Sequence, residues 1–172
     1  MIYAIGIISV ILAVALDQFT KYLAITQLQD QPITIIKGVF QLRYLENKGA
    51  AFGMFQNQQA FFLIIGIITL VFIGILYVRM PLDKRFIPLR ICMISITSGA
   101  IGNMIDRVRF QYVVDFLYFE LIDFPVFNVA DIYATVSTTA LIILFMFYYK
   151  ESDIDCLFDV LKPRKKKENK DK

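Results

Sequence analysis

Residues 99–131, GAIGNMIDRVRFQYVVDFLYFELIDFPVFNVAD, decide how the rest of the chain is organised. An apolar segment ends in Asn103, Asp106 and Arg107, and a second apolar segment begins directly after Asp131. Asp115 interrupts the apolar run that lies between them. Ionisable groups beside long apolar segments are costly to remove from water, so their presence indicates a function. We predict that Asp115 and Asp131 are catalytic.

The composition indicates a membrane protein. The chain has 172 residues, 58% of them hydrophobic and 19% charged, with a mean hydropathy of +0.61. A soluble domain is about half apolar and about a quarter charged. Histidine is absent, which excludes imidazole bases and most zinc sites. Cys92 and Cys156 are far apart and show no paired spacing, so we expect no disulfide and no metal, and we also expect no cofactor and no nucleic-acid partner.

Uncharged runs of the length needed to cross a bilayer divide the chain. We predict one membrane-embedded domain over residues 1–150, with a charged, flexible cytoplasmic tail over 151–172. A cleaved signal peptide is an alternative for the first run, because Ala13-Val14-Ala15 imitates a cleavage site, but residues 2–16 lack a basic start. The predicted fold class is a mainly α four-helix membrane bundle with spans at about 2–25, 60–78, 89–106 and 129–149.

The first long connector, residues 26–59, carries signals for a small sheet. Residues 33–44 are rich in β-branched and aromatic side chains on either side of Lys37-Gly38, which predicts short strands. Asn47-Lys48-Gly49 predicts a turn, and residues 50–55 a short amphipathic segment. The second long connector covers about 107–128.

Basic residues predict the orientation, because positive charge is retained in the cytoplasm. The loop at 79–90 has four Lys or Arg and one acid, and residues 150–172 have eight Lys or Arg and six acids. Residues 106–131 instead have two Arg and five acids. We therefore expect both termini in the cytoplasm and both long connectors outside, in a multi-pass membrane protein.

Each polar pair also has a structural interpretation. Asp17 and Lys21 are four residues apart and share a helix face, where they could simply end a span. Asn103 and Arg107 have the same spacing, and Arg107 could extend to the interface.

The two acids have such alternatives as well. Asn128 and Asp131 fit a capping box, which could account for Asp131 by itself. Asp115 points opposite Val114 and Phe116 and could face water from a strand.

Two carboxylates at the mouth of an apolar cavity can share one proton. One can then take a proton from water while the other polarises a carbonyl, as in aspartic proteases. Ser95, Ser98 and Ser137 have no Lys or His base on this side, which disfavours serine catalysis.

Five segments, in this order, resemble the motifs of bacterial lipoprotein signal peptidases (signal peptidase II). They are DQFTK at 17–21, NKGAAF at 47–52, GAIGNMIDR at 99–107, VVDF at 113–116 and FNVAD at 127–131. The resemblance implies a small extracytoplasmic β-cradle, a short amphipathic helix, and an aspartyl endopeptidase. Such an enzyme removes the signal peptide of a prolipoprotein just before its diacylglyceryl-modified cysteine.

The resemblance also implies residue roles. Asp115 and Asp131 match the catalytic pair, and Asp17 and Lys21 a supporting pair. It implies a monomer in the lipid of the bacterial inner membrane, with its active site toward the extracytoplasmic side, that binds the prolipoprotein and the cyclic peptide inhibitor globomycin. The residues that match the lining of the site are Asn47, Gly49, Asn103, Arg107, Asn128 and Ala130.

A small transporter or channel component that uses the same acids is the alternative from another class, and a membrane scaffold is a third. Transporter sites lie near the middle of the bilayer. The polar residues of this chain are expected at one end of the bundle, which favours the peptidase.

Overall fold

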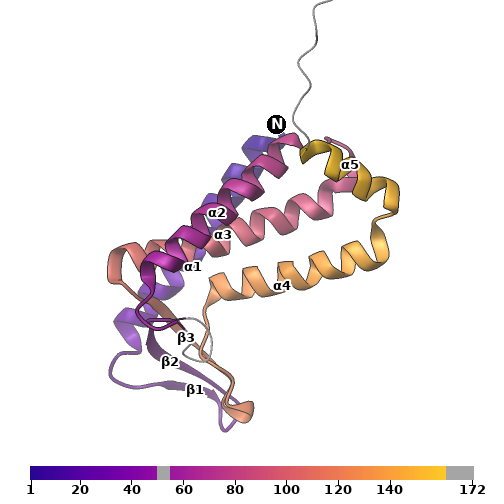
Figure 1. The fold of residues 1–172 in the computed structure, drawn as a ribbon. Helices are drawn as coiled ribbons and strands as arrows, with labels where there is room; N and C mark the ends of the chain where they lie inside the picture. The colour runs from indigo at the N-terminus through magenta and orange to yellow at the C-terminus, as the bar shows by residue number, and fades with distance from the viewer. Residues whose placement is uncertain (50–54, 162–172) are drawn as a thin grey trace, which may run out of the picture.

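A computed structural model describes residues 1–49 and 55–161 of the chain (Figure 1). Helices dominate this part, with one small sheet at one end of the helical bundle. The helices are α1 (Ile2–Gln27), α2 (Gln59–Arg79), α3 (Ile87–Phe110), α4 (Val129–Ile143) and α5 (Glu151–Leu161), and the strands are β1 (Ile33–Ile36), β2 (Phe40–Asn47) and β3 (Val113–Tyr118).

Among the described residues, four helices are long and apolar enough to cross a membrane. They are α1, α2, α3 with the short turn before it, and α4, which continues as a π-helical turn over Leu144–Tyr148. Leucine, isoleucine and phenylalanine side chains cover the outside of these helices and remain exposed. An exposed apolar surface of this extent fits lipid rather than water. The predicted four-span architecture with a small sheet is therefore confirmed.

Helix α3 is the centre of the bundle, because α1, α2 and α4 all pack against it. Gly99 and Gly102 bring its neighbours close. A Cβ atom on Gly99 would lie 2.5 Å from the carbonyl oxygen of Ala130 in α4, and one on Gly102 would collide with the carboxylate of Asp17 in α1. Small residues at such crossings let helices approach in a membrane, where no hydrophobic force drives them together.

The sheet is antiparallel in the order β1-β2-β3. Lys37-Gly38 forms the turn between β1 and β2, and Gly38 has a φ of +72°, in the left-handed region that glycine tolerates. In the pairing of β2 with β3, Leu45 lies opposite Asp115. The predicted strands at this position are confirmed, and their register fixes where Asp115 lies.

Strand β3 is buried on both faces. Val114 and Phe116 pack into an apolar cluster with Ala24 and Leu28 of the α1 end, so Asp115 takes the opposite face. The predicted alternation along this strand is correct. The alternative in which Asp115 faces water is wrong, because only 1% of its surface is exposed.

Residues 151–161 differ from the flexible tail that the sequence predicts for residues 151–172. Residues 151–161 form α5, whose Ile154 and Leu157 pack on the apolar cluster at the far end of the bundle. Asp153 of α5 accepts hydrogen bonds from the guanidinium of Arg85 and from the backbone N–H of Lys150. These contacts hold the helix in place. Residues 162–172 and most of the predicted amphipathic segment at 50–55 lie outside the described residues.

The contact between α3 and α4 gives a testable prediction. The substitution Gly99→Ala forces α3 and α4 apart and should lower the free energy of unfolding by about 1–3 kcal/mol. Circular dichroism of the protein in detergent micelles follows the loss of helical structure on heating and so measures the stability of each variant. Gly74→Ala is the matched control, since an added Cβ there meets nothing within 4 Å. Equal stability of the two variants would contradict the proposed close contact.

Candidate active site

A cavity of about 550 Å³ lies where β3 and the connector after it meet α3 and α4. One part of its wall is polar, with Asn47, Gly49, Asn103, Arg107, Asp115 and Asp131. The rest is mostly apolar, including Val113, Phe124, Val126, Ile132 and Val136. Six of the residues predicted for the site therefore share one cavity.

Asp115 comes to the cavity from β3, and both oxygens of its buried carboxyl group accept hydrogen bonds. Asn128 Nδ2 donates to Oδ1 at 2.6 Å, and Asn47 Nδ2 donates to Oδ2 at 2.9 Å. Burial raises the pKa of Asp115 to about 7, with a further contribution from the negative charge of Asp131. The two amide donors act in the opposite direction, because they stabilise the ionised form. Near neutral pH this carboxyl group therefore exists in both protonation states.

Asp131 comes to the cavity from the first turn of α4. Its Oδ2 accepts the backbone N–H of Asn128 at 3.1 Å, and its own N–H donates to Asn128 Oδ1 at 3.0 Å, so the predicted capping box is formed. Its Oδ1 accepts Asn103 Nδ2 at 2.8 Å. The start of a helix also favours a negative charge. Capping and a position on the cavity wall are thus combined in one side chain.

Two asparagine side chains connect these acids. Asn128 Nδ2, which donates to Asp115, also lies 3.1 Å from Oδ1 of Asn103, whose own Nδ2 donates to Asp131. Asn128 is completely buried. A continuous path of amide hydrogen bonds therefore runs from one carboxyl group to the other.

Arg107 places a positive charge beside the acids. Its guanidinium lies 4.6 Å from the centre of the Phe62 ring and donates to the carbonyl oxygens of Asn103 and Gly49, each at 3.3 Å. It interacts electrostatically with Asp131 and Asp115. Its Nε is buried and has no hydrogen-bond partner among the described residues. Arg107 therefore points to the cavity, and the alternative in which it extends to the membrane interface is wrong.

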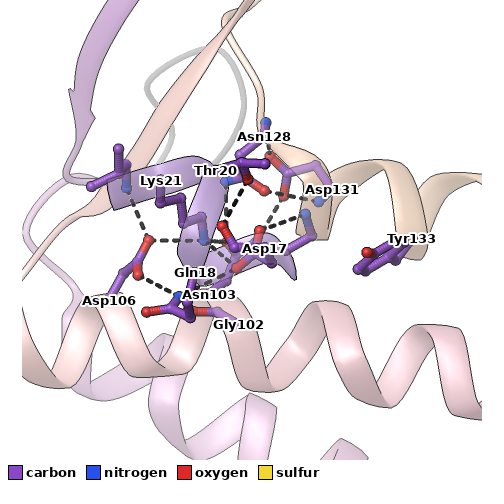
Figure 2. Close-up of polar contacts among 12 residues, drawn as sticks. Asp17, Gln18, Thr20, Lys21, Gly102, Asn103, Asp106, Asn128, Asp131 and Tyr133 are labelled. Atoms are coloured by element: carbon purple, nitrogen blue, oxygen red, sulfur yellow. Dashed lines mark hydrogen bonds and ion pairs between the residues drawn. The ribbon is translucent and has the colours of Figure 1, made fainter. Parts of the chain in front are cut away.

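Asp17, Lys21 and Asp106 form a buried ionic cluster, which Figure 2 shows. Lys21 Nζ lies 3.1 Å from Asp17 Oδ2, as the sequence spacing predicts, and 2.8 Å from Asp106 Oδ2. Gln18 Nε2 donates to Asp106 Oδ1 at 2.9 Å. Sequence reasoning assigned no role to Gln18 or Asp106. Asp106 lies three residues after Asn103 and therefore on the same helix face, which could have indicated its place in the cluster. The sequence around Gln18 contains no comparable spacing.

Two of the predicted lining residues lie elsewhere. Asn128 is not part of the cavity wall, because it is buried beneath the two acids. Ala130 is not part of it either: its side chain is fully buried where α3 and α4 cross, close to Gly102. Its backbone N–H donates to Asp17 Oδ1 at 2.9 Å. Both residues therefore shape the site without being exposed in it.

The cavity offers acid and base chemistry. A pair of carboxyl groups on one wall, one of them with a pKa near neutrality, can supply a proton donor and a proton acceptor to the same bound molecule. In the described part of the chain, no group of three or more acidic or cysteine side chains could hold a metal ion.

Comparisons with known proteins identify the family. The model of the family described as signal peptidase (SPase) II matches residues 9–147. A lipoprotein signal peptidase of Clostridioides difficile is 43% identical over 147 residues, covering 85% of this chain and 97% of the relative. One from Caldanaerobacter subterraneus is 43% identical over 146 residues, covering 83% and 96%. A solved bacterial membrane enzyme superposes with a TM-score of 0.74 at 30% identity, covering 86% of this chain and 93% of its own. The chain is a multi-pass membrane protein that belongs to the signal peptidase II family.

Proposed function

We propose that this protein is an aspartyl endopeptidase that removes the signal peptide of prolipoproteins on the N-terminal side of the diacylglyceryl-modified cysteine. One observation carries the proposal. The carboxyl groups of Asp115 and Asp131 come from different elements, line the same cavity and are joined by the amides of Asn128 and Asn103. Family membership supports the reaction, since the relatives are lipoprotein signal peptidases.

The surroundings of the two acids divide their roles. Asp131 starts as the ionised base, because it lies at the N-terminus of α4, accepts two N–H groups and lies near the charge of Arg107. Asp115 starts as the protonated acid, because burial favours its neutral form. Asp131 takes a proton from a water molecule as that water attacks the scissile carbonyl carbon. Asp115 donates its proton to the carbonyl oxygen, which gives a neutral tetrahedral diol.

Breakdown of the diol completes the reaction. The proton that Asp131 gained passes to the nitrogen of the leaving amine as the C–N bond breaks, and Asp115 regains a proton from one hydroxyl of the diol. Each acid thereby returns to its starting state, and the scissile bond gains one water. The two titrate as a unit, so the assignment describes the starting state of the pair.

The other polar residues have supporting roles in this proposal. Asn47 and Asn128 hold Asp115 rather than the substrate, since each donates its amide to that carboxyl group. Arg107 lines the cavity, where its positive charge can face a carbonyl oxygen of the substrate. The apolar wall that includes Val126 and Val136 receives apolar parts of the signal peptide or its lipid, and globomycin blocks the same cavity.

The orientation follows from charge. The loop between α2 and α3 and the segment after α4 are rich in Lys and Arg, which supports a cytoplasmic location for them and for the N-terminus. The sheet lies at the opposite end of the bundle (Figure 1), and residues of β2 and β3 line the cavity there. The site therefore faces the outside of the bacterial cytoplasmic membrane, where a translocated precursor carries its modified cysteine.

Replacing either acid tests the reaction. Asp115→Asn and Asp131→Asn should each lower kcat for a lipidated prolipoprotein by at least about 10²-fold, because one proton-transfer group is lost. Cleavage in detergent micelles is measured by mass spectrometry of the released signal peptide. Asp123→Asn is the matched control, since Asp123 is an exposed acid in the same connector. Full activity of either dyad variant would rule out the two-acid mechanism.

The pH dependence of kcat/KM tests the state of Asp115. Because its pKa is raised to about 7 and the acid must be protonated, kcat/KM should fall as the pH rises above about 7. Asn47→Ala removes a donor that stabilises the ionised form, so it raises this pKa and should move the fall to higher pH. A shift of the fall to lower pH would contradict the assignment of Asp115 as the acid.

Cysteine labelling tests the orientation. In a variant with Cys92→Ala and Cys156→Ser, we introduce Thr34→Cys in β1 or Leu82→Cys in the loop before α3, both exposed positions. A membrane-impermeant maleimide applied to spheroplasts should label the first and should label the second only after the cells are permeabilised. The reverse pattern would place the cavity in the cytoplasm.

A further inference from the structure

We propose that the buried ionic cluster of Asp17, Lys21 and Asp106 is a positioning device that sets the two acids of the proposed dyad relative to each other. The inference rests on the proposed function and deepens it. It assigns Asp106 a role that the sequence did not indicate, and it gives Asp17 and Lys21 a defined action. None of the three residues lines the cavity, so none is catalytic.

The burial of this cluster is unusual for a contact that only joins two helices. Asp17, Lys21 and Asp106 are 0%, 2% and 1% exposed. Removing three charges from water is so costly that well-packed apolar residues of similar volume often stabilise a protein as well or better. The contact of α1 with α3 therefore does not require ionic residues, and their use suggests another purpose.

Each carboxylate of the cluster holds the backbone beside one acid of the dyad. Asp106 Oδ2 accepts the N–H of Val114 at 3.1 Å, the residue directly before Asp115. Asp17 Oδ1 accepts the N–H of Ala130 at 2.9 Å, the residue directly before Asp131. Lys21 binds both carboxylates, so the start of α4 and strand β3 are tied to one ammonium group.

Lys21 also fixes the orientation of an amide in the site. Its Nζ donates to Asn103 Oδ1 at 2.8 Å, as Figure 2 shows. An ammonium group can only donate, so it holds the oxygen of this amide on its own side. Asn103 Nδ2 is thereby directed to Asp131 Oδ1, at 2.8 Å. The positive charge of Lys21 strengthens this hydrogen bond through the amide.

The remaining contacts prevent the cluster from rearranging. Gln18 Nε2 donates to Asp106 Oδ1 at 2.9 Å and lies 3.3 Å from Asp17 Oδ2, so every carboxylate oxygen of the cluster has a partner. Gly102 lies against Asp17 with no room for a side chain. A network in which every carboxylate oxygen has a partner favours one arrangement, which is what positioning two acids requires.

The cluster also acts through charge. Two carboxylates and one ammonium leave a net charge of −1 behind the site. The charge of Lys21 lowers the pKa of Asp115. In the described part of the chain, Arg107 of α3 and Asp131 of α4 also act on Asp115 through charge. Changing the cluster's charge in opposite directions should therefore move the pH profile in opposite directions.

The test compares Asp106→Asn, Lys21→Gln and the double variant in cleavage of a lipidated prolipoprotein. Each single variant should lower kcat about 10²-fold, the cost of a misplaced reacting group, with KM changed less than about threefold.

The same variants should change the pH profile in opposite directions. Asp106→Asn makes the cluster less negative and should move the high-pH fall of kcat/KM to lower pH. Lys21→Gln makes it more negative and should move the fall to higher pH. The double variant restores the net charge, so its fall should return to the wild-type pH while kcat stays low.

Arg90→Gln is the matched control for loss of stability. Arg90 is a buried cation at the other end of the bundle, where it donates to the carbonyl oxygens of Tyr77 and Met80. Its variant should unfold at lower temperature but retain kcat and the pH profile per folded molecule. The positioning role is overturned if the cluster variants behave like Arg90→Gln, or if both single variants move the pH profile the same way. If Lys21→Gln does not fold, the kcat of the double variant is the test: a low kcat supports the positioning role, and a wild-type kcat overturns it.

The dyad variants separate this inference from the proposed function. If Asp131→Asn cleaves normally, the peptidase mechanism fails and the cluster has no acids to position. If Asp131→Asn is inactive while the cluster variants keep full kcat, the mechanism stands and only the positioning role is overturned.

Discussion

Lys21 of α1 pairs with Asp17 of its own helix and with Asp106 of α3, at the point where the apolar bundle ends and the sheet begins. At this depth every charge and every backbone N–H must have a partner, because water is scarce and an unpaired group is costly. The partners that satisfy Lys21 are carboxylates whose other oxygens hold β3 and the start of α4. The hydrogen bonds that satisfy these buried groups therefore connect α1, α3 and α4 to the sheet.

Helix α3 makes this arrangement possible. It carries Gly99, where α4 approaches, and Gly102, where α1 approaches, and it supplies Asn103, Asp106 and Arg107. Small residues shorten the distance between helices, and the polar residues one turn further on then reach across it. The same face of α3 thus provides close packing in the bundle and polar groups at its end.

The start of α4 combines local and long-range requirements. Its capping box satisfies the first N–H groups of the helix, as the start of any helix requires. The same carboxylate lies on the cavity wall, where the helix terminus favours its ionised form. Asp115 lies instead in a buried strand, and burial raises its pKa to about 7. Two identical side chains thereby lie in different surroundings, which the elements that carry them determine.

The sequence by itself determined the four spans, the strands around Gly38, the Asp17–Lys21 pair and the capping box, because each depends on hydropathy or on neighbours within about four residues. Only the tertiary structure decided that Asp106 and Gln18 complete the ionic cluster, since their partners lie on another helix. It also placed Ala130 and Asn128 beneath the site and α5 against the bundle. Those contacts depend on how helices and strands cross, and a local pattern of residue types does not encode that geometry.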